Sequence, residues 1–189
     1  MNFKWDLRID EAIKLSSIAH NGQFRKGNKI PYISHPLAVG LILQKVGATN
    51  EQIIAGILHD TIEDTYLEFA DIEEKFGIKI AKLVSDCSEE DPKAPWQERK
   101  NKTLINLKNS SQEVKLIVCA DKFHNLMCLK EDLEKLGEEK LWKLFGKGRQ
   151  EQAWYYNQLA TIFLDNANLE DNNSLFFQFK EEVKNFFGK

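Results

Sequence analysis

The sequence predicts an all-α protein folded as a single domain over residues 1–189. Its 189 residues contain only 4 prolines and 10 glycines, and Leu, Ile, Lys and Glu are abundant, which favours helices. Apolar residues recur at helical spacing along most of the chain, and no run alternates as a half-buried strand would. A chain of this length can bury a core without disulfides, so we expect one layered helical bundle.

The first half of the chain contains five predicted helices. Asp10 is the expected N-cap of the first, which buries Ala12, Ile13, Ile18 and Ala19. A loop follows at 23–34, where Gly27, Asn28 and Pro31 are turn formers. Pro36 suits the first turn of the second helix, Thr49 or Asn50 caps the third, and a hinge at Gly77 separates the last two. The predicted ranges are 11–22, 36–47, 51–64, 68–76 and 78–86.

The second half begins with a predicted loop at 87–96, followed by helices over 96–109 and 112–130. A longer helix is expected over 138–165, where Gly146 and Gly148 are candidate breaks. Residues 169–174 form a predicted turn before an aromatic helix over 175–187, so the C-terminal helices occupy 138–187.

Charge and composition limit the classes of partner. The formal net charge of −3 argues against binding to long nucleic acid or to an anionic membrane. The longest apolar run, 37–43, is far shorter than the roughly 20 residues of a membrane span. The three cysteines are odd in number and have no C-x-x-C spacing, and acidic residues interrupt the N-terminus where a signal peptide is apolar. We therefore expect a cytoplasmic protein with reduced thiols.

Four ionisable groups are concentrated in "ILHDTIEDT" at 57–65. On a helix with about 100° per residue, His59 and Glu63 are about 40° apart, as are Asp60 and Asp64. The four side chains then share one face at the edge of an apolar segment, where like charges repel and raise one another's pKa. A helix end that frays into solvent is the alternative for this segment taken alone; a bound divalent cation would remove the repulsion.

Two further residues favour the cation. His35 opens the second predicted helix, and Asp121 interrupts a nearly apolar helix, where a lone carboxylate is costly unless it is paired or bound to metal. With His59 and Asp60 they form a set of two imidazoles and two carboxylates that leaves positions for water. Such a set suits Mn²⁺ or Fe²⁺, and Zn²⁺ is less natural without thiolates.

The flanking sequence carries a resemblance. Four stretches resemble the hydrolase domain of RelA/SpoT-type enzymes, which belong to the HD superfamily of metal-dependent phosphohydrolases. They are "AHNGQFRKGNKIPYISHP", "AGILHDTIEDT", "FG" and "ADKFHNL". The likeness covers about residues 8–160 and implies an HD-fold helical bundle. A chain of this length looks like a small alarmone hydrolase, the group that includes the metazoan SpoT homologue.

The resemblance implies a role for each matching residue. The ligands of a single Mn²⁺ ion correspond to His35, His59, Asp60 and Asp121. The pair that serves the hydrolytic water corresponds to Glu63 and Asp64, without a division of acid and base roles between them. Substrate-binding positions correspond to Arg25, Lys26 and Asn125, and Lys122 is a further candidate for phosphate contact.

The remaining histidines and two departures complete the candidate site. His20 is expected in the core or beside a ligand, and His124 is expected to orient a ligand from one turn beyond Asp121. The long enzymes usually read H-N-x-R-T where this chain reads "HNLMC", so Met127 and Cys128 replace an arginine and a threonine. We expect the preference for the base to change there.

The implied activity is hydrolysis of guanosine 3′,5′-bis(diphosphate), or its triphosphate form, to GDP or GTP and pyrophosphate. Other candidate substrates are adenosine alarmones, the 2′-phosphate of NADPH, and a pyrophosphorylated RNA end, in which case the chain would act as antitoxin to a toxic synthetase. A nucleotide sensor without catalysis is disfavoured because the ligand set and the Glu63–Asp64 pair are both intact. The expected partner is a small nucleotide, and the sequence does not specify an oligomeric state.

Replacing Cys128 by threonine should sharpen base selection. A threonine hydroxyl donates and accepts hydrogen bonds well, whereas a cysteine thiol does both weakly. One recovered neutral hydrogen bond is worth roughly 1 kcal/mol, about fivefold in a rate ratio. The ratio of kcat/KM for guanosine over adenosine alarmones should rise by about that factor in Cys128→Thr. An unchanged ratio would show that the base is selected elsewhere.

Overall fold

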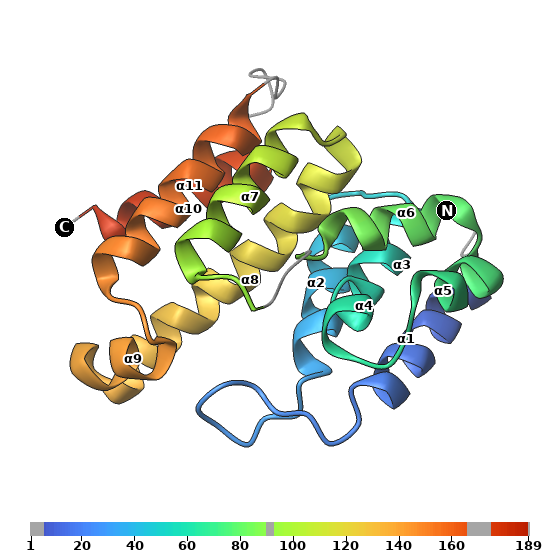
Figure 1. Ribbon diagram of the computed structural model, residues 1–189, viewed down its shortest axis with the longest axis horizontal. Helices are drawn as coiled ribbons and strands as arrows, with labels where there is room; N and C mark the ends of the chain where they lie inside the picture. Colours follow the sequence, from blue (N-terminus) through green and yellow to red (C-terminus); the bar gives the residue numbers. More distant parts are fainter. Residues whose placement is uncertain (1–5, 90–92, 166–174, 189) are drawn as a thin grey trace. The chain divides into compact units, whose positions relative to one another are not determined.

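The computed structural model describes residues 6–89, 93–165 and 175–188, and in these ranges every named element is a helix (Figure 1). The described residues contain no named strand, and a single isolated bridge pairs Phe24 with Pro31. The predicted all-α class is confirmed. The elements are α1 Leu7–Ala19, α2 Ser34–Lys45, α3 Asn50–Leu58, α4 Thr61–Asp64, α5 Phe69–Phe76, α6 Ile78–Cys87, α7 Trp96–Asn109, α8 Gln112–Leu136, α9 Glu138–Phe145, α10 Arg149–Leu164 and α11 Leu175–Phe187.

The chain divides into two compact units, Met1–Glu90 with α1 to α6 and Asp91–Lys189 with α7 to α11. Each unit has its own buried apolar side chains. The single domain expected over residues 1–189 stays a prediction. No helix of the described residues is both long and apolar enough to cross a membrane.

Helix α3 is the centre of the first unit. It packs against α1, α2 and α6, and α5 packs against α6. Every residue of α3 from Gln52 to Leu58 is buried, and a helix that is buried on all sides is apolar all round. Thr49 and Gln52 close its N-terminus with a capping box, which confirms one of the two predicted caps. The C-terminal end of α3 therefore presents its last residues from a fixed position.

Two glycines let α2 and α3 approach closely. A Cβ atom at Gly40 would lie 2.7 Å from Cγ1 of Ile57, and a Cβ atom at Gly56 would overlap Cδ1 of Leu43. Leu43 is fully buried, so its methyl group has no free space into which to move. The contact brings the helix that carries His35 against the helix that ends at His59.

The second unit is built on α8, which packs against α9, α10 and α11, while α10 also packs against α7 and α11. Its core is aromatic. The Phe163 ring stacks on that of Phe176 with a centroid distance of 5.6 Å, and it meets the Phe179 ring edge-on with a centroid distance of 5.2 Å. Aromatic pairs at these separations add to the energy of area burial alone. These pairs join α10 to α11, and both helices pack against α8, which carries Asp121 and Asn125.

Several predicted boundaries are wrong. Helix α1 starts at Leu7 because Asp6, not Asp10, caps it by accepting from the backbone N–H of Arg8. Ala12 and Ala19 are buried as expected, but Ile18 has 64% of its surface exposed, because the buried face of the helix centres on Ala12, Ser16 and Ala19. The expected helix 51–64 ends at Leu58 and restarts as the short α4 at Thr61.

In the second half, α8 continues to Leu136, six residues beyond the predicted end at 130, because Gly137 supplies the left-handed φ of 76° that ends it. The predicted break in 138–165 is confirmed at Gly146, with a φ of 68°. The predicted helices 96–109 and 175–187 are also confirmed. The turn expected at 169–174 and part of the loop expected at 87–96 lie outside the described residues.

Substituting Gly56 by alanine should disturb both stability and the placement of His35 and His59, two of the expected ligands. The added methyl group must push Leu43 and α2 away, an overpacking that costs typically 1–3 kcal/mol. We expect a lower free energy of unfolding in urea together with weaker Mn²⁺ binding by calorimetry. The double variant Gly56→Ala/Leu43→Ala makes room for the methyl group and should lose less stability than the sum of its single variants. Additive losses would show that the two side chains do not meet.

Candidate metal centre

His59 and Asp60 lie at the junction between α3 and α4. His59 is the C-cap of α3, and Asp60 is the N-cap of α4. The His59 Nδ1 atom is 2.8 Å from the carbonyl oxygen of Gly56. A carbonyl oxygen can only accept, so Nδ1 carries a proton, and Nε2 is the ring nitrogen that faces the neighbouring carboxylate. That Nε2 is 3.0 Å from Oδ2 of Asp60.

His35 brings the second imidazole from α2. Its Nε2 is 3.7 Å from the same Oδ2 of Asp60, and its ring centroid is 5.1 Å from that of His59. Both histidines are buried, with 1% and 3% of their surfaces exposed. The first unit thus brings together three of the four residues that the sequence suggested as ligands.

The donor set fits a divalent cation. A bare imidazole nitrogen and a carboxylate oxygen both present lone pairs, and at 3.0 Å they repel unless a proton or a cation lies between them. A metal-bound histidine ordinarily donates its other ring N–H to a carbonyl or carboxylate, as His59 does to Gly56. Imidazole and carboxylate ligands together suit Mn²⁺, Fe²⁺ or Zn²⁺.

Tyr32 is a site residue that the sequence analysis missed. Its hydroxyl group donates to Oδ2 of Asp60 at 2.7 Å and lies 3.4 Å from Oδ2 of Asp64. It therefore orients one candidate ligand and contacts one candidate water-handling carboxylate. Tyr32 stands in a loop, where no periodicity marks an inward-facing residue; its spacing of three residues before His35 was the one available signal.

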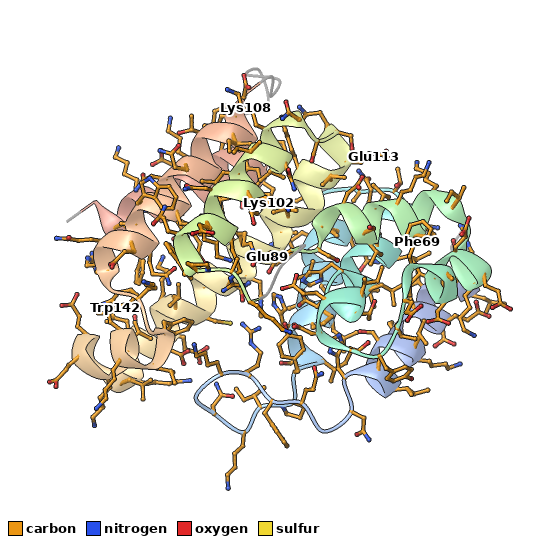
Figure 2. All side chains as sticks on the ribbon, in the orientation of Figure 1. Phe69, Glu89, Lys102, Lys108, Glu113 and Trp142 are labelled. Carbon is orange, nitrogen blue, oxygen red and sulfur yellow. The ribbon has the colours of Figure 1, made fainter. Side chains whose placement is uncertain are left out.

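Glu63 and Asp64 lie on the short α4, one turn beyond Asp60. Burial raises the pKa of Glu63, although the backbone N–H of Glu89 (labelled in Figure 2) donates to its Oε2 at 2.8 Å and opposes that rise. Burial and repulsion from Asp60 raise the pKa of Asp64, and His20 and Tyr32 oppose this. Carboxylates with raised pKa values are suited to exchanging protons near neutral pH.

The two basic residues expected to bind substrate lie in the loop between α1 and α2. The Arg25 backbone N–H donates to the carbonyl oxygen of Ile30 at 2.9 Å, and the Arg25 guanidinium carbon is 5.6 Å from the ring centroid of Tyr32. This cation–π contact holds the guanidinium beside the residue that contacts Asp60 and Asp64. Lys26 is exposed.

In the second unit, Asp121 lies in the middle of α8 and is buried. Its Oδ1 accepts from Nδ2 of Asn125 at 2.5 Å, and its Oδ2 is 2.8 Å from Nζ of Lys122. Asn125 lies four residues after Asp121 on α8, and a spacing of four residues puts both side chains on one face of a helix. The role of Asp121 as the fourth ligand stays a prediction. The other three expected ligands, His35, His59 and Asp60, lie in the first unit, whereas Asp121 lies in the second.

Two further side-chain contacts lie in the second unit. The Cys128 Sγ atom is 3.9 Å from both ring nitrogens of His124, one helical turn away. Lys100 on α7 has its Nζ 5.1 Å from the ring centroid of Tyr155 on α10, and Lys102 projects from the same α7 (Figure 2). The basic groups of α7 and the tyrosines of α10 thus meet within one unit.

Comparison with known proteins gives a consistent result. The model of a family described as HD domain matches residues 12–144. The chain is 38% identical over 125 residues to a guanosine-3′,5′-bis(diphosphate) 3′-pyrophosphohydrolase, MESH1, of Xenopus tropicalis, a match that covers 65% of this chain and 69% of that protein. It is 34% identical over 128 residues to the bifunctional (p)ppGpp synthase/hydrolase SpoT of Escherichia coli, of which the match spans 18%.

Two solved structures are similar. The protein lmo0812 of Listeria monocytogenes EGD-e is 34% identical with a TM-score of 0.75, and the match covers 82% of this chain and 99% of that one. A metazoan orthologue of SpoT, described as hydrolysing ppGpp, has a TM-score of 0.76 over 97% of each chain. At 23% identity, the second similarity supports the fold alone.

Replacing Glu63 by glutamine should stabilise the metal-free protein at neutral pH. Burial raises the pKa of Glu63, so the stability that its protonated form contributes is present at low pH and is lost as pH rises through the folded-state pKa. Glutamine stays neutral and can still accept from Glu89. Urea unfolding in EDTA should give Glu63→Gln a higher free energy of unfolding at pH 7, and the gain should shrink at pH 4. A variant less stable than wild type at pH 7 would contradict this account.

Proposed function

We propose that this chain, which belongs to the HD domain family, is a metal-dependent 3′-pyrophosphohydrolase of guanosine 3′,5′-bis(diphosphate) and its triphosphate form. The observation that carries the proposal is the cluster of His35, His59 and Asp60, in which the Nε2 atoms of two buried imidazoles lie 3.7 and 3.0 Å from one carboxylate oxygen. The names of the similar proteins from Xenopus tropicalis and Escherichia coli support the same reaction.

One divalent cation would be held by His35, His59, Asp60 and Asp121. We propose Mn²⁺, because two imidazoles and two carboxylates leave positions for water on an octahedral ion; Fe²⁺ and Zn²⁺ are the alternatives. When bound, such an ion lowers the pKa of a water molecule and neutralises phosphoryl charge. Tyr32 keeps Asp60 oriented, because its hydroxyl group occupies one lone pair of Oδ2.

The chain's own residues would handle the protons. Water attacks the nearer phosphorus of the 3′-pyrophosphate, the bond from that phosphorus to the 3′-oxygen breaks, and pyrophosphate leaves. The Glu63–Asp64 pair accepts a proton from the water and supplies one to the 3′-oxygen, so the products are GDP or GTP and pyrophosphate. The raised pKa values of both carboxyl groups make this exchange easier near neutral pH.

Substrate binding is assigned to Arg25, Lys26, Lys122 and Asn125. The net charge of −3 repels a polyphosphate, so local cations must hold it. Arg25 is already placed against Tyr32, which would set its guanidinium beside the reacting phosphate groups. Lys122 and Asn125 both contact Asp121 and would link the nucleotide to that carboxylate.

A second candidate substrate class is the adenosine alarmones. Cys128 stands where the long relatives have threonine, and its thiol lies against His124, so a polar contact to the base would be weaker. The 2′-phosphate of NADPH and a pyrophosphorylated RNA end share the same phosphoester chemistry and complete the panel. We place the reaction in the cytoplasm, where these nucleotides occur.

The deciding experiment assays purified protein with Mn²⁺ against this panel of substrates and measures the release of pyrophosphate or phosphate. We expect the 3′-pyrophosphorylated guanosine nucleotides to give the highest kcat/KM. Asp60→Ala should lose bound Mn²⁺ and activity together, because it removes the carboxylate shared by both histidines. The matched control Asp86→Ala removes a carboxylate from α6 outside the cluster and should retain both.

Two outcomes would contradict the proposal. Full Mn²⁺ occupancy with normal turnover in Asp60→Ala would remove that residue from the ligand set. A wild-type protein that binds Mn²⁺ and guanosine alarmones without hydrolysing them would instead be a nucleotide sensor.

A further inference from the structure

His20 is a buried histidine of the first unit that the proposed reaction does not use. It is the C-cap of α1, and 2% of its surface is exposed. Its Nδ1 is 2.7 Å from Oε1 of Gln23, and its ring centroid is 4.9 Å from that of Tyr32. Its Nε2 is buried, and no donor of the described residues reaches it.

The neighbouring amide determines the tautomer of His20. The Gln23 Nε2 atom donates to the backbone carbonyl oxygen of Asp64 at 2.7 Å. Since that carbonyl can only accept, the amide must face it with its NH₂ group, and Oε1 must face His20. An amide oxygen also only accepts, so His20 Nδ1 carries the proton. In this tautomer Nε2 presents a lone pair, and no donor of the described residues reaches it.

His59 has the same arrangement, with Nδ1–H donated to a carbonyl oxygen and its Nε2 directed at the cluster. The two rings differ in what they face. His59 faces a carboxylate in a set suited to a cation, whereas His20 belongs to a group with Gln23, Tyr32 and Asp64 that supplies no second carboxylate. Buried polar atoms in native proteins are almost always satisfied by protein or by an ordered water.

We propose that His20 is a positioning residue for Asp64: its Nε2 accepts a hydrogen bond from an ordered water that also donates to the Asp64 carboxylate. This inference rests on the proposed hydrolase function. Asp64 is then held from two directions, by Gln23 at its backbone and by the water bound to His20, and the Tyr32 hydroxyl group lies 3.4 Å from its Oδ2. With its orientation restricted, the carboxylate stays turned toward the hydrolytic water instead of rotating into solvent.

The tautomer can be tested without substrate. In a long-range ¹H–¹⁵N spectrum of the ¹⁵N-labelled full chain near neutral pH, His20 should show a protonated Nδ1 and a bare Nε2. The variant Gln23→Leu removes the acceptor and should give a mixture of the two tautomers. A protonated Nε2 in the wild type would overturn the proposal, because that atom could not accept from water.

The positioning role requires kinetics. His20→Phe keeps a ring against Tyr32 but has no lone pair, and we expect kcat to fall by about 10- to 100-fold with little change in KM or Mn²⁺ content. His20→Gln places an amide oxygen near the position of Nε2 and should recover part of the loss. The exposed Ser17→Ala on the same helix is the matched control and should behave as wild type.

The other outcomes distinguish failure of the positioning role from failure of the proposed function. Wild-type kcat in His20→Phe would overturn the positioning role alone, and so would a loss of Mn²⁺ in parallel with activity, because His20 would then support the ligands. No hydrolysis by the wild-type chain would refute the proposed function, whereas the ¹⁵N spectrum would still decide the tautomer.

Discussion

The close contact between α2 and α3 is the constraint on which the first unit depends. Gly40 and Gly56 remove the side chains that would separate the two helices, and Ile57 and Leu43 fill the contact instead. Because α3 is buried along almost its whole length, its C-terminal end cannot shift without disturbing α1, α2 and α6 together. The hydrophobic core thus holds the ring centroids of His35 and His59 5.1 Å apart.

In the polar cluster, three carboxylates lie close together although they repel one another. Asp60, Glu63 and Asp64 stand within one turn of one another, and burial raises the pKa of the last two. Such an arrangement costs stability in the absence of a cation, because partial burial and mutual repulsion both oppose the charged forms. The stability lost at neutral pH and the capacity to exchange protons have the same physical origin.

Hydrogen bonds to carbonyl and amide oxygens place a proton on Nδ1 of two buried histidines. Gly56 sets the tautomer of His59, and Gln23 sets that of His20. Tyr32 joins the two arrangements, because its ring lies against His20 and its hydroxyl group reaches Asp60. Removing any one of these acceptors or donors would change the state of a neighbour, so the cluster acts as one network.

The sequence alone determined the fold class and suggested the chemistry of the site. Few prolines and glycines with helical periodicity sufficed for an all-α fold, since helix formation depends mainly on nearby residues. The order of His35, His59, Asp60 and Asp121 suggested a cation because ligand chemistry belongs to the residue type. The contact between Asp121 and Asn125 also followed from spacing, since both lie on one helix.

Only the tertiary structure decided which side chains face one another across the chain. Ile18 has an apolar side chain but points outward, because periodicity marks a stripe without stating which neighbour covers it. Tyr32 and Gln23 lie in or beside a loop that has no periodicity, and their partners Asp60 and Asp64 are 28 and 41 residues away in sequence. The tautomer of His20 depends on an amide that a distant carbonyl orients, so it follows from packing and cannot be derived from local sequence.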